Sequence, residues 1–160
     1  MELETLIRRF SDTTENQEKA IFSSIFILGN KLQALFDQHI PSLTLKQFML
    51  LSLVRQANEP MSLSQYGLML GCSRQNIKKL AKSLEQKGFV TLGSHQKDPR
   101  ALQLVPTSKV EAFFKTSFLK YQEELKSLFE IYTPQEIEAL FTLLSKLYIG
   151  IEHLEKETKQ

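Results

Sequence analysis

The chain has 160 residues, of which 42% are hydrophobic and 24% charged, and its formal net charge is +2. These proportions are those of a globular protein with a buried core, and no uninterrupted apolar run approaches the roughly 18 residues that a membrane span needs. The acidic start lacks the basic-then-apolar order of a signal peptide, so we expect a cytoplasmic protein without a membrane partner.

Residues that build most metal and catalytic sites are sparse. Cys72 is the only cysteine, which excludes an intramolecular disulfide and a cysteine-rich zinc site. The three histidines lie far apart and have no metal-ligand spacing, so we expect neither a metal nor another cofactor. The sequence also lacks a paired acid and base, a glycine-rich phosphate loop and a nucleophile with a plausible base. We therefore expect that the protein is not an enzyme.

Positive charge is concentrated in the middle third of the chain. Between residues 60 and 105 there are seven basic residues and two acidic ones, a net charge of +5, which leaves −3 for the remainder. A local excess of this kind is typical of a segment that binds a polyanion such as nucleic acid.

The first predicted element is a long amphipathic helix over residues 16–38. Phe26 and Ile27 widen its apolar face, so we expect the helix to pack against more than one neighbour. The main apolar residues recur at intervals of three and four, as one buried helix face requires: Ile21, Phe22, Ile25, Leu28, Leu32, Leu35 and Phe36.

Three shorter helices follow. Thr44 and Gln47 have the spacing of a capping box, in which two side chains bind free N–H groups at a helix start, so a helix is predicted to begin there. The next helix is predicted over residues 62–70. Ser73 is placed to cap the third, over residues 74–87, and a glycine follows each of the last two helices.

Two short strands are predicted after these helices, over residues 89–92 and 101–105, joined by a polar and basic hairpin loop over residues 93–100. Helix, glycine-containing turn, helix and β-hairpin in this order indicate a winged helix-turn-helix. We therefore predict a mainly α fold with a small β-hairpin wing.

Two long helices are predicted to complete the chain, over residues 109–131 and from the cap Thr133 to about residue 156. We expect a single domain over residues 1–160, with a DNA-binding head at about 42–105. The segments 1–40 and 107–160 form its helical region.

The helix over residues 73–87 has one apolar and one basic face. At 100° per residue, its apolar side consists of Ile77, Leu80, Ala81 and Leu84. Arg, Lys and Gln side chains bind phosphates and purine edges in the major groove, and the first turn of a helix favours a nearby phosphate. We therefore predict that this helix binds DNA through Ser73, Arg74, Gln75, Asn76, Lys78, Lys79 and Lys82.

The hairpin loop adds two candidate DNA contacts. Lys97 and Arg100 are predicted to enter a minor groove or to bind flanking phosphates, with Asp98 orienting Arg100 through a charge-assisted hydrogen bond. A basic helix face alone is as typical of a solvated surface as of DNA binding. The neighbouring turn and hairpin favour the DNA-binding interpretation. The alternative function is a winged-helix module that binds another protein.

Four stretches of this region occur together in one known family: residues 44–48, residues 63–77 with Leu70-Gly71-Cys72-Ser73-Arg74-Gln75, residues 84–90 with Leu84-Glu85-Gln86-Lys87-Gly88, and Asp98-Pro99-Arg100. They resemble the core of the MarR-type winged helix-turn-helix transcriptional regulators. With the flanking helices, the resemblance covers residues 16–156. It implies a homodimeric transcription regulator, which we expect to be a repressor, whose two heads read a pseudo-palindromic site on double-stranded DNA.

The same resemblance implies that the terminal helices join two subunits, whereas their apolar pattern alone is equally typical of a self-contained helical layer. It also implies a small apolar or phenolic effector, bound in a crevice between these helices and the head, that releases the DNA. Six side chains are candidates for this crevice, although phenylalanine at helical spacing is more often core: Phe22, Phe26, Phe48, Phe113, Phe114 and Phe118.

Cys72 has two interpretations. A cysteine between a glycine and a helix cap acts as a small hydrophobic residue in most proteins, and we favour that role. A thiol near a helix N-terminus is also a candidate oxidant sensor, which some relatives possess, although their sensing thiol lies in the first helix.

Overall fold

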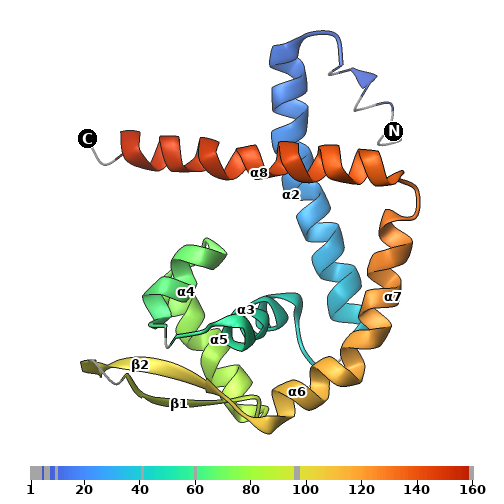
Figure 1. Ribbon diagram of the computed structural model, residues 1–160. Helices are drawn as coiled ribbons and strands as arrows, with labels where there is room; N and C mark the ends of the chain where they lie inside the picture. The colour runs from blue at the N-terminus through green and yellow to red at the C-terminus, as the bar shows by residue number, and fades with distance from the viewer. Residues whose placement is uncertain are drawn as a thin grey trace. The chain divides into compact units, whose positions relative to one another are not determined.

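The computed structural model describes residues 5, 8–9, 11–40, 42–59, 61–95 and 98–158. Their helices and strands form two compact units, residues 1–115 and 116–160. Among the described residues, the first unit holds the following elements in chain order (Figure 1): α2 (Thr14–His39), α3 (Leu45–Gln56), α4 (Leu63–Leu70), α5 (Arg74–Gln86), β1 (Val90–His95), β2 (Asp98–Pro106) and α6 (Ser108–Lys115). The second unit holds α7 (Ser117–Phe129) and α8 (Pro134–Glu157).

The mainly α fold with one antiparallel hairpin is confirmed, and local capping explains where its helices begin. The Gln47 N–H donates to Thr44 Oγ1 at 3.3 Å, and the Thr44 N–H donates to Gln47 Oε1 at 3.1 Å, so the predicted capping box of α3 is confirmed. Ser62 and Gln65 form a second box at the start of α4, which the sequence reading missed.

The single helix predicted over residues 109–131 is wrong. The backbone of Thr116 has φ −120° and ψ −77°, outside the helical region, and it separates α6 from α7. The apolar periodicity continues across this point, which is why the sequence indicates one helix. Thr116 and Ser117 are weak helix formers, so two successive residues of low propensity lie at the break.

The hairpin loop predicted over residues 93–100 is also wrong, because strand pairing extends into it. Gly93 pairs with Gln103 and Ser94 with Leu102, and the register shifts between Ser94 and His95. Antiparallel pairing uses backbone N–H and C=O groups, so polar side chains do not prevent it. The wing is therefore longer than the apolar pattern indicates.

The core of the first unit gathers around α3 and α5. Leu50 and Leu51 of α3 are fully buried together with Tyr66 of α4 and three residues of α5, namely Ile77, Ala81 and Leu84. Phe36, Phe48, Phe89, Phe113 and Phe114 form an aromatic cluster beside them, with ring centroids 5.1–6.4 Å apart in contacting pairs. This core joins α2, α3, α6 and the start of the hairpin into one body.

Candidate nucleic-acid interface

Helix α4, a tight turn and helix α5 form the helix-turn-helix. Gly71 ends α4 in the left-handed conformation at φ 63°, which glycine adopts without strain. The Cys72 N–H then donates to the Gly67 carbonyl at 2.8 Å. A Cβ atom on Gly67 would lie 2.6 Å from the Cys72 carbonyl oxygen, so only glycine allows the turn to close this tightly onto α4.

The two faces of α5 divide as the helical phasing predicts. Ile77, Ala81 and Leu84 have no exposed surface, and Leu80 is half-buried. Ser73 caps the helix by accepting a hydrogen bond from the Asn76 N–H at 3.2 Å. The candidate DNA-binding residues of this helix are all exposed: Ser73, Arg74, Gln75, Asn76, Lys78, Lys79 and Lys82.

The basic residues of this face are free of counter-charges. The side chains of Arg74, Lys78, Lys79 and Lys82 make no hydrogen bond or ion pair with any residue that the structure describes. Their N–H donors are therefore available to an external ligand, and phosphate oxygens are the acceptors that lysine and arginine bind on a duplex.

The wing is attached to the helix-turn-helix on both of its edges. The Leu92 N–H of β1 donates to Glu85 Oε1 of α5 at 2.8 Å, and Gln103 of β2 forms an antiparallel bridge with Ser62. Lys97 lies outside the described residues. The backbones of Asp98 and Arg100 belong to β2, whereas their side chains are outside what the structure describes.

Within the first unit, the structure does not bring the candidate effector-site phenylalanines together in one site. Phe48 and Phe113 are buried in the aromatic cluster, and Phe114 is half-buried at its edge, where the Arg55 guanidinium lies 4.5 Å from its ring centroid. Phe22 and Phe26 of α2 are 67% and 65% exposed, with ring centroids 5.9 Å apart. Phe118 belongs to the second unit, where its ring contacts that of Tyr121.

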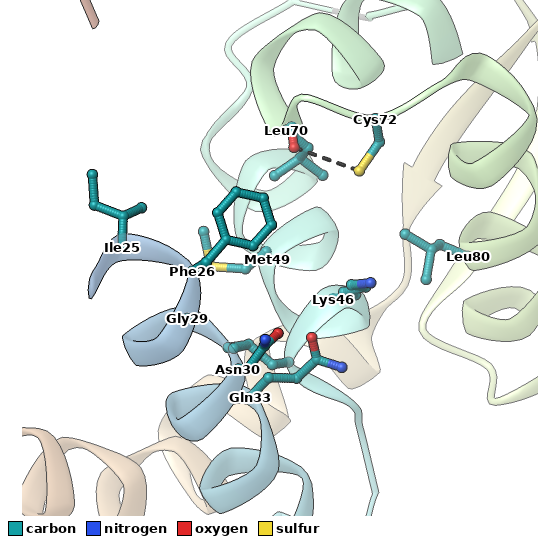
Figure 2. Close-up of a pocket in the computed structure, with 11 residues that line it drawn as sticks. Ile25, Phe26, Gly29, Asn30, Gln33, Lys46, Met49, Leu70, Cys72 and Leu80 are labelled. Carbon is teal, nitrogen blue, oxygen red and sulfur yellow. Dashed lines mark hydrogen bonds between the residues drawn. The ribbon is translucent and has the colours of Figure 1, made fainter. Parts of the chain in front are cut away.

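A pocket of about 460 Å³ lies within the first unit, between α2 and the helix-turn-helix. In Figure 2, Leu70 and Cys72 lie at one end of it and Asn30 and Gln33 at the other. Of the six phenylalanines, only Phe26 lines it. The full lining comes from α2, α3, the α4–α5 turn and α5: Ile25, Phe26, Gly29, Asn30, Gln33, Leu45, Lys46, Met49, Leu70, Cys72 and Leu80.

Cys72 therefore occupies a wall of this pocket as well as the turn before α5. Its side chain is half-buried, and its Sγ donates a weak hydrogen bond to the Leu70 carbonyl at 3.5 Å. The sequence could not reveal the pocket, because its lining combines four elements that are distant along the chain.

Within the described part of the chain, no three His, Cys, Asp or Glu side chains are grouped as a metal site requires. None of the described helices is long and apolar enough to cross a bilayer.

No model of a known protein family matches the chain. Over 88 residues, 55% of this chain, it is 30% identical to YfiV, an uncharacterized HTH-type transcriptional regulator of Bacillus subtilis. Over 108 residues, 68% of this chain, it is 26% identical to the transcriptional repressor MprA of Escherichia coli. The chain spans 55% and 61% of the lengths of these two relatives. Both relatives are named as regulators rather than enzymes.

Solved structures share this fold over most of the chain. A MarR/EmrR-family transcriptional regulator from Acinetobacter matches with a TM-score of 0.72 at 21% identity, covering 85% of this chain and 97% of that one. The chain has the fold of MarR-family transcriptional regulators. Another structure with the MarR fold, the MepR–DNA complex of Staphylococcus aureus, has a TM-score of 0.71 at 16% identity, with 81% and 97% covered. BpsR of Bordetella bronchiseptica, whose DNA binding is regulated by 6-hydroxynicotinic acid, has a TM-score of 0.67 at 20% identity, with 87% and 95% covered.

Proposed function

We propose that this protein is a transcription regulator that binds double-stranded DNA with the exposed face of α5 and with the wing. The observation that carries the proposal is the row of uncompensated cations on α5, directly after a turn that only glycine can close. The solved DNA complex of MepR, which has the same fold, supports the same role for this chain. Such a regulator would act in the cytoplasm, where it meets chromosomal DNA.

Duplex affinity of a charge variant tests this proposal. The triple variant Lys78→Ala, Lys79→Ala, Lys82→Ala removes three positive charges from α5 without changing any buried residue. The matched control removes three exposed lysines from the second unit: Lys126→Ala, Lys146→Ala, Lys156→Ala.

We expect the α5 variant to lose at least about tenfold in affinity for a duplex selected from a random library, since about 1.4 kcal/mol of lost phosphate contacts is enough for that factor. The control should bind as the wild type does. Equal affinity of both variants would instead favour a module that binds another protein.

We propose further that two copies associate through the terminal helices. Helix α8 has 24 residues and none is buried within the chain, although it carries an almost continuous apolar surface. Phe141 and Tyr148 alone are 71% and 70% exposed. An unpartnered apolar surface of this size is costly in water, and a second copy would bury it.

Association is tested by the molar mass in solution. We expect the wild type to have twice the mass of the 160-residue chain in light scattering, and Phe141→Lys with Leu147→Lys to shift it toward the monomer. A monomeric wild type would refute the dimer and leave DNA binding to be judged separately.

A small effector in the pocket beside Cys72 completes the proposal, and its binding would release DNA and relieve repression. Leu80 of α5 and Lys46 of α3 both line this pocket, so a bound molecule contacts the helix that reads DNA and the helix that supports it. The repressor MprA and the regulation of BpsR by 6-hydroxynicotinic acid are precedents among similar proteins.

The replacement Gly29→Leu tests the pocket, because nothing lies within 4 Å of a Cβ atom on Gly29 and the new side chain would enter the free space. For any small aromatic acid or phenol that releases DNA from the wild type, we expect Gly29→Leu to remain bound at concentrations about tenfold higher. Release at the wild-type concentration would place the effector elsewhere.

A further inference from the structure

One polar side chain, that of Gln47, is buried where α3 packs against α5. Gln47 of α3 is 7% exposed and is the buried polar residue among those that the structure describes. Its Nε2 donates to Ser83 Oγ of α5 at 2.8 Å, and its Oε1 accepts from Lys87 Nζ at 2.8 Å. Gln47 is therefore more than a capping residue of α3, because it also binds the side chain of Ser83 in α5 and that of Lys87, the C-cap residue of α5.

Lys87 extends this connection beyond Gln47. Its Nζ also donates to the Ser42 carbonyl at 2.9 Å, before α3, and its own carbonyl accepts from Lys109 Nζ at 2.6 Å. Lys87 is the C-cap residue of α5, and a positive charge near the C-terminus of a helix is favoured by the helix dipole. Unlike the lysines within α5, the C-cap residue Lys87 thus has two of its three ammonium donors bound within the protein.

The positions of these bonds around α5 suggest what they do. At 100° per residue, Ser83 lies at the edge of the buried face, one turn after Lys79. Glu85 lies at the opposite edge, where it holds the Leu92 N–H of the wing. Apolar packing is non-directional, whereas hydrogen bonds are directional, so bonds at both edges add a sharper constraint on the rotation of the helix about its axis.

We infer that Gln47 is a positioning residue for DNA recognition: with Ser83 and Lys87 it fixes the rotation of α5 about its own axis. Groups on the surface of a helix lie about 6 Å from its axis, so a rotation of about 20° displaces them by roughly 2 Å. A hydrogen bond to a base edge tolerates a displacement of only a few tenths of an ångström, whereas a flexible lysine side chain can keep contact with a phosphate over a larger displacement. Loss of the Gln47 bonds to Ser83 and Lys87 should therefore reduce discrimination between DNA sequences more than it reduces the general affinity for DNA.

The inference rests on the proposed function, and three variants test it. Gln47→Met keeps the volume and removes the hydrogen bonds of the side chain to Thr44, Ser83 and Lys87. Gln47→Glu keeps the acceptor for Lys87, and the Ser83 hydroxyl can reverse its role and donate to the carboxylate. Gln65→Met is the matched control, because Gln65 has the same place in the capping box of α4 and no bond to α5.

The main measurement is the ratio of affinities for a selected duplex and a scrambled one. Partial unfolding lowers both affinities together, so a purely structural role for Gln47 would leave the ratio unchanged. We expect Gln47→Met to reduce the ratio about tenfold, and Gln47→Glu and Gln65→Met to keep it within about twofold of the wild type. An unchanged ratio in Gln47→Met would overturn the inference.

A second measurement does not depend on DNA binding. Amide residual dipolar couplings of the free protein report the orientation and the rotational phase of α5. We expect the rotation of α5 about its axis to differ from the wild type in Gln47→Met and to equal that of the wild type in Gln65→Met. If the wild type discriminates no duplex, the proposed function fails, and these couplings still decide whether Gln47 orients the helix.

Discussion

Replacement of Gly67 by alanine is the sharpest structural perturbation that the helix-turn-helix offers. The added Cβ atom would lie 2.6 Å from the Cys72 carbonyl oxygen, whereas ordinary contact begins at 3.4 Å, so the two segments must part by about 0.8 Å. The opposing atom belongs to the backbone and cannot rotate away as a side chain would. Separation also stretches the 2.8 Å hydrogen bond from the Cys72 N–H to the Gly67 carbonyl.

The expected cost follows from three contributions. Overpacking costs about 1–3 kcal/mol and a weakened hydrogen bond about 1 kcal/mol, while alanine in place of glycine within a helix stabilises by about 1 kcal/mol. We therefore expect Gly67→Ala to lower the free energy of unfolding by about 1–3 kcal/mol. Gly29→Ala is the matched control, since the same substitution in α2 has open space around it and should stabilise by up to about 1 kcal/mol.

Urea unfolding followed by far-UV circular dichroism measures both variants. The protein concentration must be equal throughout, because association makes stability depend on it. We expect the free energy of unfolding to fall in Gly67→Ala and to rise in Gly29→Ala, and Gly67→Ala to bind a duplex more weakly than the wild type. If Gly67→Ala were as stable as Gly29→Ala, the close packing of the turn against α4 would be refuted.

Three further outcomes are expected. The Arg55 guanidinium, 2.8 Å from Glu111, lowers the pKa of that carboxyl below its ordinary value of 4.5. The ion pair therefore stabilises the fold above pH 4.5, and this stabilisation is lost as the pH falls through the lowered pKa. In acid unfolding, the stability of Glu111→Gln should fall less steeply below about pH 4.5 than that of the wild type, and identical curves below that pH would contradict this. Thr133→Ala removes the cap of α8 and should lower the free energy of unfolding by about 1 kcal/mol in urea, and an unchanged value would refute this role of the cap. Peroxide should leave the duplex affinity of the wild type and of Cys72→Ser equal if Cys72 is only a small pocket-lining residue, whereas release confined to the wild type would make it a sensor.

Local signals in the sequence were sufficient for much of this fold. The cap pair Thr44 and Gln47 and the phasing of α5 each depend on residues within one or two turns, so they predict the helix start and the exposed basic face correctly. The break at Thr116 was missed because apolar periodicity continues through it. The extension of the hairpin was missed because pairing between β1 and β2 satisfies backbone groups whatever the side chains are.

Features that depend on tertiary contacts could not be predicted. The bond between Gln47 and Ser83 joins residues 36 positions apart, and a capping residue gives no indication that it also binds a second helix. The pocket beside Cys72 arises where α2 meets the helix-turn-helix, and neither surface alone has a pattern that indicates a cavity. The phenylalanine pattern is ambiguous for the same reason, since helical spacing does not distinguish Phe48, which is buried in the core, from Phe26, which lines the pocket.

The salt dependence of duplex binding tests the central claim most directly. Each phosphate that a lysine neutralises adds about 0.9 to the slope of log affinity against log salt concentration. The wild type should therefore show a steep slope, and the variant lacking Lys78, Lys79 and Lys82 a slope shallower by about one for each of these lysines that contacts a phosphate. Parallel lines for the two proteins would contradict DNA binding by this face of α5.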